Sequence, residues 1–229
     1  NATYAYGKNP LKEALLSAAR TGVSPIVSIS VTKRALEDGE LMGLIQKHKL
    51  THTVVTKEEI ESAVGRDAIH QGVLITLNER ALYTSLEEVL STVNKDTNPA
   101  FVLMDGLEDP HNVGAIIRSA VAFGASAIIM PEHHQAHING TVIKAASGMN
   151  FAIPIVLIKN VNATLLSLKD KGFWTYALTG DGDTELHKAQ FDTPTVVVIG
   201  SEGEGIAKKT LEHADFRLSI KTSELCESL

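Results

Sequence analysis

The sequence predicts an α/β protein of two domains, each built on a sheet covered by helices. Short runs rich in β-branched residues alternate along the chain with segments whose apolar residues recur at helical spacing. The composition, with 44% hydrophobic and 21% charged residues, suits a chain that buries a core and differs from that of disordered proteins. At 229 residues the chain is long for one compact domain, so we expect two.

The first half of the chain predicts a small α/β sandwich. A helix is expected over residues 11–19, after the start signal Asn9-Pro10. The other elements expected here are helices over 37–48 and 57–64 and strands over 25–31, 51–56 and 72–77. Residues 79–99 then form a connection that carries one amphipathic helix, 85–90, and ends in a polar run.

The second half repeats the order of strand then helix, and its strands are almost continuously apolar. They are expected over 101–104, 127–130, 153–158, 173–178, 195–199 and 216–220. Such strands separated by helices predict a parallel sheet covered on both faces. In these sheets ligands bind at the carboxyl ends of the strands, so the segments after the strands are the first place to look for a site.

The charge is unevenly distributed between the two halves. The formal net charge is −6, yet residues 1–80 hold ten Lys and Arg against nine Asp and Glu, while residues 81–229 hold eleven against eighteen. The acidic total argues against indiscriminate binding of nucleic acid through bulk positive charge. A local basic surface in the first half stays possible, with these candidates by charge alone: Lys8, Lys33, Arg34, Lys47 and Lys49.

No apolar stretch is long enough to cross a membrane, and no signal sequence is recognisable at the start. We therefore expect a soluble, cytoplasmic protein with no membrane partner. The lone cysteine, Cys226, excludes an internal disulfide and a multi-cysteine zinc site. The sequence stops at Leu229 directly after a predicted strand and loop, so we expect the C-terminal end of the second domain to be missing from it.

The segment after the strand 101–104 carries the first polar pair. Pro110 restricts the turn, Asn112 is expected to cap the following helix, and Arg118 lies about one and a half turns further on. The pair could hold a phosphate or a sugar hydroxyl. The simpler interpretation is a capping asparagine and a solvated arginine.

Two glycine-bearing loops follow other strands. The loop Gly200–Gly205 lacks the Lys-Ser/Thr pair of a phosphate-binding P-loop, and Glu202 and Glu204 would repel a polyphosphate. Its glycines suggest close approach to an uncharged group such as an adenosine, or simply a tight turn. The loop Thr179–Asp183 alone is a turn with solvated acids, although several such loops could build one pocket.

Metal binding and nucleophilic catalysis have little support. His133, His134 and His137 lie where a loop is expected and no carboxylate spacing accompanies them, so we expect an exposed loop that touches a partner rather than a metal site. Ser147 and Ser201 lack the context of a nucleophile with its base. Hydrolysis by a catalytic triad is therefore not expected.

With these residues in view, the sequence resembles the TrmH/SpoU family of RNA ribose 2'-O-methyltransferases, in the SPOUT class. The segments that carry the resemblance are DPHNVGAIIR (109–118), KAASGM (144–149) with Pro154, IGSEGEG (199–205) and, by position, residues 216–229. In the first half, YGKNP (6–10) and HQGV (70–73) are similar to the L30e-like domain of the bacterial subgroup that methylates a guanosine in large-subunit (23S-type) rRNA.

The resemblance implies an L30e-like RNA substrate-binding domain over residues 3–79, a linker over 80–99 and a SPOUT methyltransferase domain over 100–229 with a C-terminal trefoil knot. It implies S-adenosylmethionine as cofactor, no metal, and a homodimer in which the first motif of one subunit lies near the cofactor of the other. The residues implied to hold the cofactor are Leu178, Gly180, Ile199, Gly200, Gly203, Ile220 and Leu229.

The resemblance also implies catalytic roles for Asn112, Arg118 and Glu202. A guanidinium rarely gives up its proton, so we expect Arg118 to grip a phosphate and stabilise the developing alkoxide while Asn112 orients the ribose. Glu202 would hold these two in place or contact the substrate. Lys221-Thr222 replaces the family's usual Pro-Met, and two alternatives stay open: a tRNA substrate, or a noncatalytic RNA-binding protein that retains the fold.

Overall fold

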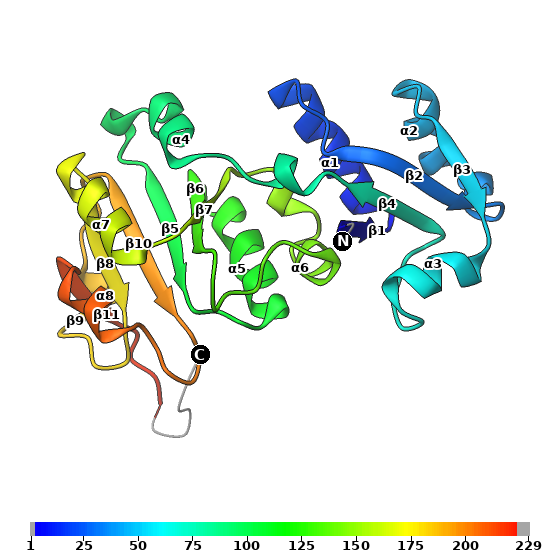
Figure 1. Cartoon of the computed structure of the whole chain (residues 1–229). Coiled ribbons are helices and arrows are strands. Elements are labelled where there is room, and N and C mark those ends of the chain that lie inside the picture. Colours follow the sequence, from blue (N-terminus) through cyan, green and yellow to red (C-terminus); the bar gives the residue numbers. More distant parts are fainter. Residues whose placement is uncertain (1–2, 224–229) are drawn as a thin grey trace. The chain divides into compact units, whose positions relative to one another are not determined.

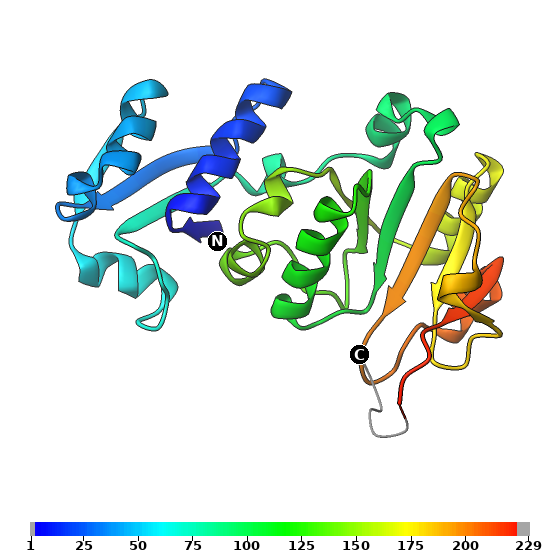
Figure 2. The same cartoon turned by 180° about the vertical axis from the view of Figure 1, so that it is seen from behind.

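The computed structural model describes residues 3–223 and confirms the predicted α/β class (Figures 1 and 2). Leu229 and Cys226 lie outside the described residues. The described chain falls into two compact units. Unit 1 consists of residues 3–83, 110–118 and 137–152, and unit 2 of residues 84–109, 119–136 and 153–223. The division into domains expected from the sequence stays a prediction.

Unit 1 contains a four-stranded sheet in the order β1-β4-β2-β3. Strand β4 is antiparallel to both of its neighbours, and β2 and β3 are parallel. Figures 1 and 2 show α1 and α2 on one face of this sheet and α3 on the other. The bounds are β1 Thr3–Tyr6, α1 Lys8–Thr21, β2 Ile26–Thr32, η1 Ala35–Glu37, α2 Gly39–Lys47, β3 His52–Val55, α3 Lys57–Val64, β4 Val73–Leu77 and η2 Glu79–Leu82.

Side-chain caps set where two of these helices begin. Asp38 accepts hydrogen bonds from the backbone N–H groups of Glu40 and Leu41 and so starts α2. This cap explains why the helix predicted over 37–48 is interrupted at Asp38. Thr56 and Glu59 form a reciprocal capping box at the start of α3.

The remainder of unit 1 is a pair of tightly packed helices. Helix α5 spans Pro110–Ala122 and begins in this unit, and α6 spans Gly140–Ala145, followed by η4, Met149–Phe151. A Cβ added at Gly114 would lie 2.5 Å from the Ala145 Cβ and 2.7 Å from the Val142 carbonyl oxygen. The absence of a side chain at Gly114 is therefore what allows α5 and α6 to approach this closely.

Unit 2 contains a seven-stranded sheet in the order β7-β6-β5-β10-β8-β11-β9, and every pair of neighbours is parallel, as predicted. The two-residue strand β9 was not predicted. The bounds are α4 Leu86–Thr92, η3 Lys95–Thr97, β5 Ala100–Asp105, β6 Ala127–Pro131, β7 Ile155–Ile158, α7 Val161–Asp170, β8 Trp174–Leu178, β9 Thr184–Glu185, η5 Leu186–Lys188, β10 Thr195–Gly200, α8 Lys208–Glu212 and β11 Phe216–Ser219.

The core of unit 2 lies where the central strands meet α4 and α7. Phe101 on β5 stacks on Phe173, with ring centroids 4.7 Å apart, and both side chains are fully buried. Val198 on β10 and Leu168 on α7 belong to the same buried cluster. The near-continuous apolar runs of the sequence thus identify strands buried on both faces.

Two helix starts differ from the sequence prediction. Helix α1 begins at Lys8, so Asn9 and Pro10 lie inside its first turn, where the missing N–H of proline is tolerated. Helix α5 begins at Pro110 for the same reason. Asn112 is therefore the third helical residue and not the helix cap, which corrects the sequence-based expectation.

Candidate functional site

The carboxyl ends of the central strands of unit 2 meet at one edge of the sheet, shown in Figure 1 at the arrowheads of β5, β8 and β10. Ile199 is in register with Leu178, and Gly200 is in register with Asp105. Leu178 is also paired with Leu218, so the cofactor candidate Ile220, two residues further on, leaves the sheet at the same edge. The structure therefore brings together most of the residues implied to bind a cofactor.

The loop after β10 is closed by its own backbone. Ser201 and Gly205 exchange hydrogen bonds, with N to O distances of 3.2 and 3.0 Å. A Cβ at Gly200 would collide with the backbone of Gly205 and Ile206, whereas a Cβ at Gly203 would meet nothing within 4 Å. The tight-turn interpretation therefore accounts for Gly200 and for Gly205, which closes the turn with φ 68°, whereas Gly203 takes no part in these hydrogen bonds and has open space beside it.

The loop after β8 is fixed against the end of β11. The N–H of Thr179 donates to the Leu218 carbonyl at 2.9 Å, and the Ser219 hydroxyl donates to the Gly182 carbonyl at 3.1 Å. A Cβ at Gly182 would collide with the backbone of these two β11 residues, while Gly180 is exposed with nothing within 4 Å of the Cβ position. Gly180 and Gly203 thus leave room for a ligand without serving the turn geometry of their own loops.

A hydrogen bond also fixes the acid in this loop. The Thr179 hydroxyl lies 2.6 Å from Asp181 Oδ1, and this bond lowers the pKa of the Asp181 carboxyl below its ordinary value. At the end of β5, which is separated from β8 by β10, Asp105 accepts a hydrogen bond from the Ala207 N–H at 3.3 Å. Both carboxylates therefore serve the local structure of the loops.

The three predicted catalytic residues belong to two different units. Asn112 and Arg118 lie on the part of α5 in unit 1, and Glu202 lies in the exposed loop of unit 2. Six residues along one helix separate two side chains by about 9 Å along the axis and about 120° around it. Arg118 is exposed and Asn112 is half-buried. Their convergence with Glu202 stays a prediction.

Within the described residues, no group of three or more His, Cys, Asp and Glu side chains could hold a metal ion. The segment of His133, His134 and His137 is a loop after β6, in which His133 and His134 are exposed as expected, whereas His137 is half-buried. Gln135 anchors this loop by accepting a hydrogen bond from the Leu107 N–H at 2.9 Å. A contact of the loop with a partner stays a prediction.

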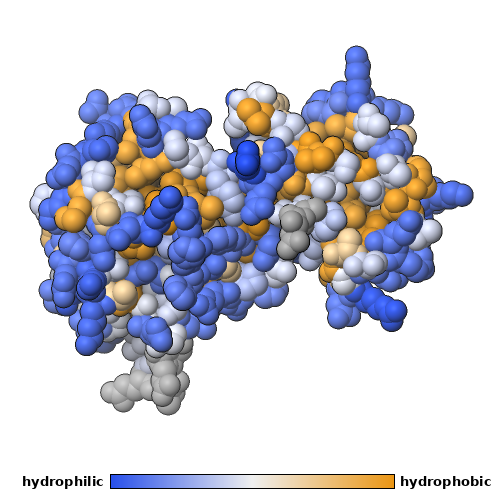
Figure 3. Space-filling view, in the orientation of Figure 1, coloured by the Kyte–Doolittle hydropathy of each residue, from blue (hydrophilic) through white to orange (hydrophobic). Residues whose placement is uncertain are grey.

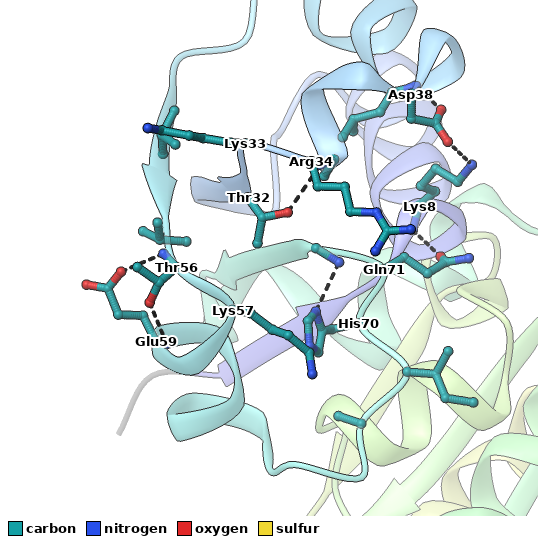
Figure 4. Close-up of a pocket in the computed structure, with 17 residues that line it drawn as sticks. Lys8, Thr32, Lys33, Arg34, Asp38, Thr56, Lys57, Glu59, His70 and Gln71 are labelled. Carbon is teal, nitrogen blue, oxygen red and sulfur yellow. Dashed lines mark hydrogen bonds and ion pairs between the residues drawn. The ribbon is translucent and has the colours of Figure 1, made fainter.

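A second candidate site is a cavity of about 870 Å³ in unit 1, drawn in Figure 4. Of the five basic residues proposed from charge, the structure places Lys8, Lys33 and Arg34 in its lining, whereas Lys47 and Lys49 lie outside the lining. The cavity lies between the turn after β2, the start of α3 and residues 68–72. The sequence did not predict this cavity, because residues far apart in the chain enclose it.

The two sequence motifs of the first half meet at this cavity. The Lys8 N–H donates to Gln71 Oε1 at 3.1 Å, and the Gly7 N–H donates to the Val73 carbonyl at 3.1 Å. Gln71 has φ 53° and Gly72 φ 74°, so two consecutive residues adopt the left-handed conformation. Glycine is required at the second position because a Cβ there would collide with the side chain of Thr32.

Further hydrogen bonds hold residues 70–72 in place. The Gly72 N–H donates to His70 Nδ1 at 3.0 Å, and the Thr32 N–H donates to the Gly72 carbonyl at 2.9 Å. The Val73 N–H donates to the His70 carbonyl at 2.9 Å. This side of the cavity is therefore a fixed corner of backbone.

Ion pairs shape the charge at the cavity. Lys8 Nζ lies 2.8 Å from Asp38 and 3.3 Å from Glu40. The hydrogen bond to Asp38 raises the pKa of Lys8, and the same bond lowers the pKa of Asp38. Lys57 pairs with Glu61 at 2.7 Å, which raises the pKa of the lysine.

The surface of the molecule is mixed in polarity. Figure 3 shows apolar areas among hydrophilic ones over the N-terminal elements. Two apolar residues of the cavity lining, Val54 and Ile69, are 45% and 70% exposed.

Among the described residues, no helix is both long and apolar enough to traverse a membrane.

Comparisons with known families cover nearly the whole chain. The SpoU rRNA Methylase family matches residues 99–229, and the family described as RNA 2'-O ribose methyltransferase substrate binding matches residues 4–82. A 23S rRNA (guanosine-2'-O-)-methyltransferase RlmB of Ralstonia nicotianae is 36% identical over 75% of this chain and 68% of its own length. An uncharacterized tRNA/rRNA methyltransferase of Synechocystis is 32% identical over 93% of this chain, which spans 56% of the length of that relative.

Solved structures show the same fold. The SpoU methyltransferase AviRb from Streptomyces viridochromogenes, solved in complex with AdoMet, has a TM-score of 0.82 at 19% identity, over 99% of this chain and 83% of its own. An AdoMet-bound rRNA methyltransferase from Sinorhizobium meliloti has a TM-score of 0.80 at 22% identity, over 100% and 81%. The comparisons confirm the resemblance stated from the motifs.

Proposed function

This chain belongs to the SpoU rRNA methylase family, and on that premise we propose that it transfers a methyl group from S-adenosylmethionine to the ribose 2'-hydroxyl of a guanosine in 23S-type rRNA. The observation that carries the proposal is the convergence of strand ends in unit 2, where Leu178, Ile199 and Gly200 meet at one edge of the parallel sheet. This edge is where such sheets bind ligands.

The residues at this edge fit the proposed cofactor. Gly180 and Gly203 leave open space for an adenosine beside their backbones, and the 49% exposed side chain of Ile220 offers an apolar surface. When bound, the cofactor supplies a methyl group on a positively charged sulfur, which needs no metal to activate it. We include Leu229 in the proposed cofactor site from the family resemblance. The trefoil knot belongs to the proposal on the same ground.

Arg118 and Asn112 supply the proposed chemistry on the substrate side. The guanidinium stays charged, so it binds an RNA phosphate and stabilises negative charge on the 2'-oxygen as that oxygen takes the methyl group and its proton passes to water. Asn112 orients the ribose, and Glu202 positions these two groups or contacts the substrate. Because Asn112 and Arg118 point about 120° apart on α5, the exposed Arg118 side chain can face a second subunit, in agreement with the homodimer implied by the family.

A tRNA substrate is the second candidate function. It is favoured by the Synechocystis relative, which covers 93% of this chain and is named as a tRNA/rRNA methyltransferase. A noncatalytic RNA-binding role is the third, favoured by Lys221-Thr222 in place of the family's Pro-Met. A cytoplasmic location follows from the proposed RNA substrates.

The cofactor proposal is tested by calorimetric titration of the protein with S-adenosylmethionine. Gly180→Ala and Gly203→Ala should weaken binding at least tenfold without changing the unfolding midpoint, because only a bound ligand would meet the new methyl groups. The matched control for cofactor binding is Gly43→Ala in α2, whose Cβ also meets nothing within 4 Å and which should bind the cofactor as the unaltered chain does. Absence of cofactor binding to the unaltered chain would favour the noncatalytic role.

The substrate proposal is tested by methyl-transfer assays on 23S rRNA fragments and on tRNA. Each RNA is supplied with and without a preinstalled 2'-O-methyl group at the candidate guanosine. We expect transfer to the unmodified rRNA and none to the modified one. Transfer to tRNA alone would replace the rRNA proposal with the second candidate.

A further inference from the structure

The cavity of unit 1 has uncompensated positive charge at its rim. Both acids in its lining already serve as helix caps, since Asp38 caps α2 and pairs with Lys8, and Glu59 closes the capping box of α3. The side chains of Lys33 and Arg34 form no ion pair or hydrogen bond with any residue between 3 and 223. The two cations that remain available therefore favour an anionic ligand.

The cavity also presents oriented hydrogen-bond donors. Because His70 Nδ1 accepts the Gly72 N–H, the neutral ring carries its proton on Nε2, which bonds to no other described residue. Gln71 Oε1 accepts the Lys8 N–H, and this leaves the amide N–H₂ of Gln71 as a donor. Both residues line the cavity, and Figure 4 shows the Arg34 side chain extending toward the side where Gln71 lies.

The rest of the lining is apolar. Ala35 and Leu41 are buried, and Val54 and Ile69 expose large apolar surfaces. A flat aromatic group gains from such walls, and a volume of about 870 Å³ is within the range of ligand pockets. Phosphate-binding cations at the rim, donors on one side and apolar walls together match a nucleotide. A base stacked and paired within a duplex could not enter a concave cavity of this kind.

We propose that this cavity binds one unpaired nucleotide of the RNA substrate, with the base among the apolar walls and its flanking phosphates on Lys33 and Arg34. The proposal rests on the proposed function, since it assigns a subsite to the RNA which that function requires. Gln71 and His70 donate hydrogen bonds to acceptor atoms on the edge of the base. The site therefore selects single-stranded segments over duplex.

The test measures how binding of a fluorescein-labelled single-stranded hexaribonucleotide to the full chain depends on salt. The double variant Lys33→Ala/Arg34→Ala removes two phosphate contacts, so the slope of log K against log salt should fall by about 1.4 and the affinity at least tenfold. Gln71→Ala should weaken binding several-fold without changing the slope, because it removes a contact to a base. A hairpin RNA whose stem has six base pairs should bind the unaltered chain at least tenfold more weakly than the single-stranded hexanucleotide does.

The matched control is Lys47→Ala/Lys49→Ala, which removes the same charge from exposed positions outside the cavity. An equal loss of slope in this control, an unchanged slope in the cavity variant, or equal binding of the duplex would each overturn the nucleotide site. Titration with S-adenosylmethionine separates this from the proposed function. Loss of hexanucleotide binding in the cavity variant with normal cofactor binding supports the site, whereas a chain that binds the hexanucleotide but not the cofactor contradicts only the methyltransferase proposal.

Discussion

Replacing Gly114 by alanine should destabilise unit 1, although the same change elsewhere in a helix stabilises it. Both Gly114 in α5 and Gly43 in α2 are interior helical residues without positive φ. Helix propensity alone favours alanine by about 1 kcal/mol at either position. The two sites differ only in what surrounds the new methyl group.

The magnitude follows from the packing of α5 on α6. The new Cβ would lie 2.5 Å from the Ala145 Cβ, 2.7 Å from the Val142 oxygen and 3.0 Å from the Ala146 nitrogen. Carbon atoms pack at about 3.5–4.0 Å, so the helices must separate by about 1 Å. Overpacking of this kind costs about 1–3 kcal/mol. Two of the three contacts are backbone atoms that cannot rotate away, so we expect a cost near the top of this range and a net loss of roughly 2 kcal/mol after the gain in propensity.

The assay is urea unfolding followed by far-ultraviolet circular dichroism. Both glycines belong to unit 1, so their variants report on the same compact unit. Gly114→Ala should lower the midpoint and Gly43→Ala should raise it. A double variant with Ala145→Gly removes the carbon contact and should recover part of the loss, which a double-mutant cycle measures.

An increase in stability for Gly114→Ala, equal to that for Gly43→Ala, would refute the close packing of α5 on α6. Additive effects of the Gly114 and Ala145 changes would show that these two side-chain positions do not touch.

Three further predictions concern the ion pair of Lys8, the Arg118 side chain of α5 and the core. The pKa of Asp38 is lowered in the folded state, so its pairing with Lys8 stabilises the fold above the carboxyl's unfolded pKa of about 4, and this stabilisation is lost as the pH falls through the folded pKa. Lys8→Met should therefore lower the thermal midpoint at pH 6, while at pH 2.5 the midpoints of the variant and the unaltered chain should be nearly equal. Arg118→Lys should reduce kcat at least tenfold with cofactor binding unchanged, and near-normal turnover would rule out a bidentate grip on phosphate. Phe173→Ala should cost about 3–5 kcal/mol in urea unfolding because it leaves a cavity beside a stacked ring, whereas Trp174→Ala, at a 45% exposed side chain, should cost clearly less.

The pattern of apolar residues along the sequence predicted the strands of the large sheet but not the exact residues at which the helices begin. The apolar runs identified the parallel strands, because strands buried on both faces need no polar residues. Exact helix starts depended on single residues: Pro110 could occupy either the turn or the first helical position, and Asp38 could continue a helix or cap a new one. Hydrogen bonds in the first turn decide where each helix begins, and the spacing of apolar residues carries no information about these bonds.

The candidate sites were predictable to different degrees. The glycine-rich motif located the edge of the sheet, but only the three-dimensional packing separates Gly200, which its own chain requires, from Gly203, which has open space. The unit 1 cavity depended on the contact between Lys8 and Gln71, which are 63 residues apart. The two consecutive motif residues Gln71-Gly72 were the available signal, since a Gly after a polar residue is typical of a left-handed corner.

The corner at residues 70–72 is complete before any ligand arrives. The Gly72 carbonyl and N–H are already bonded to Thr32 and His70, the His70 carbonyl is bonded to Val73, and Gln71 and Gly72 both adopt the left-handed backbone conformation. Freezing a loosely held loop upon association costs entropy, and that loss lowers affinity. Here the chain has already lost that conformational freedom during folding, so a ligand meets a preorganised site, and little of the binding energy is spent on ordering the loop. Fast association of short RNA segments is the kinetic behaviour that such a preformed site permits, because no loop has to rearrange first.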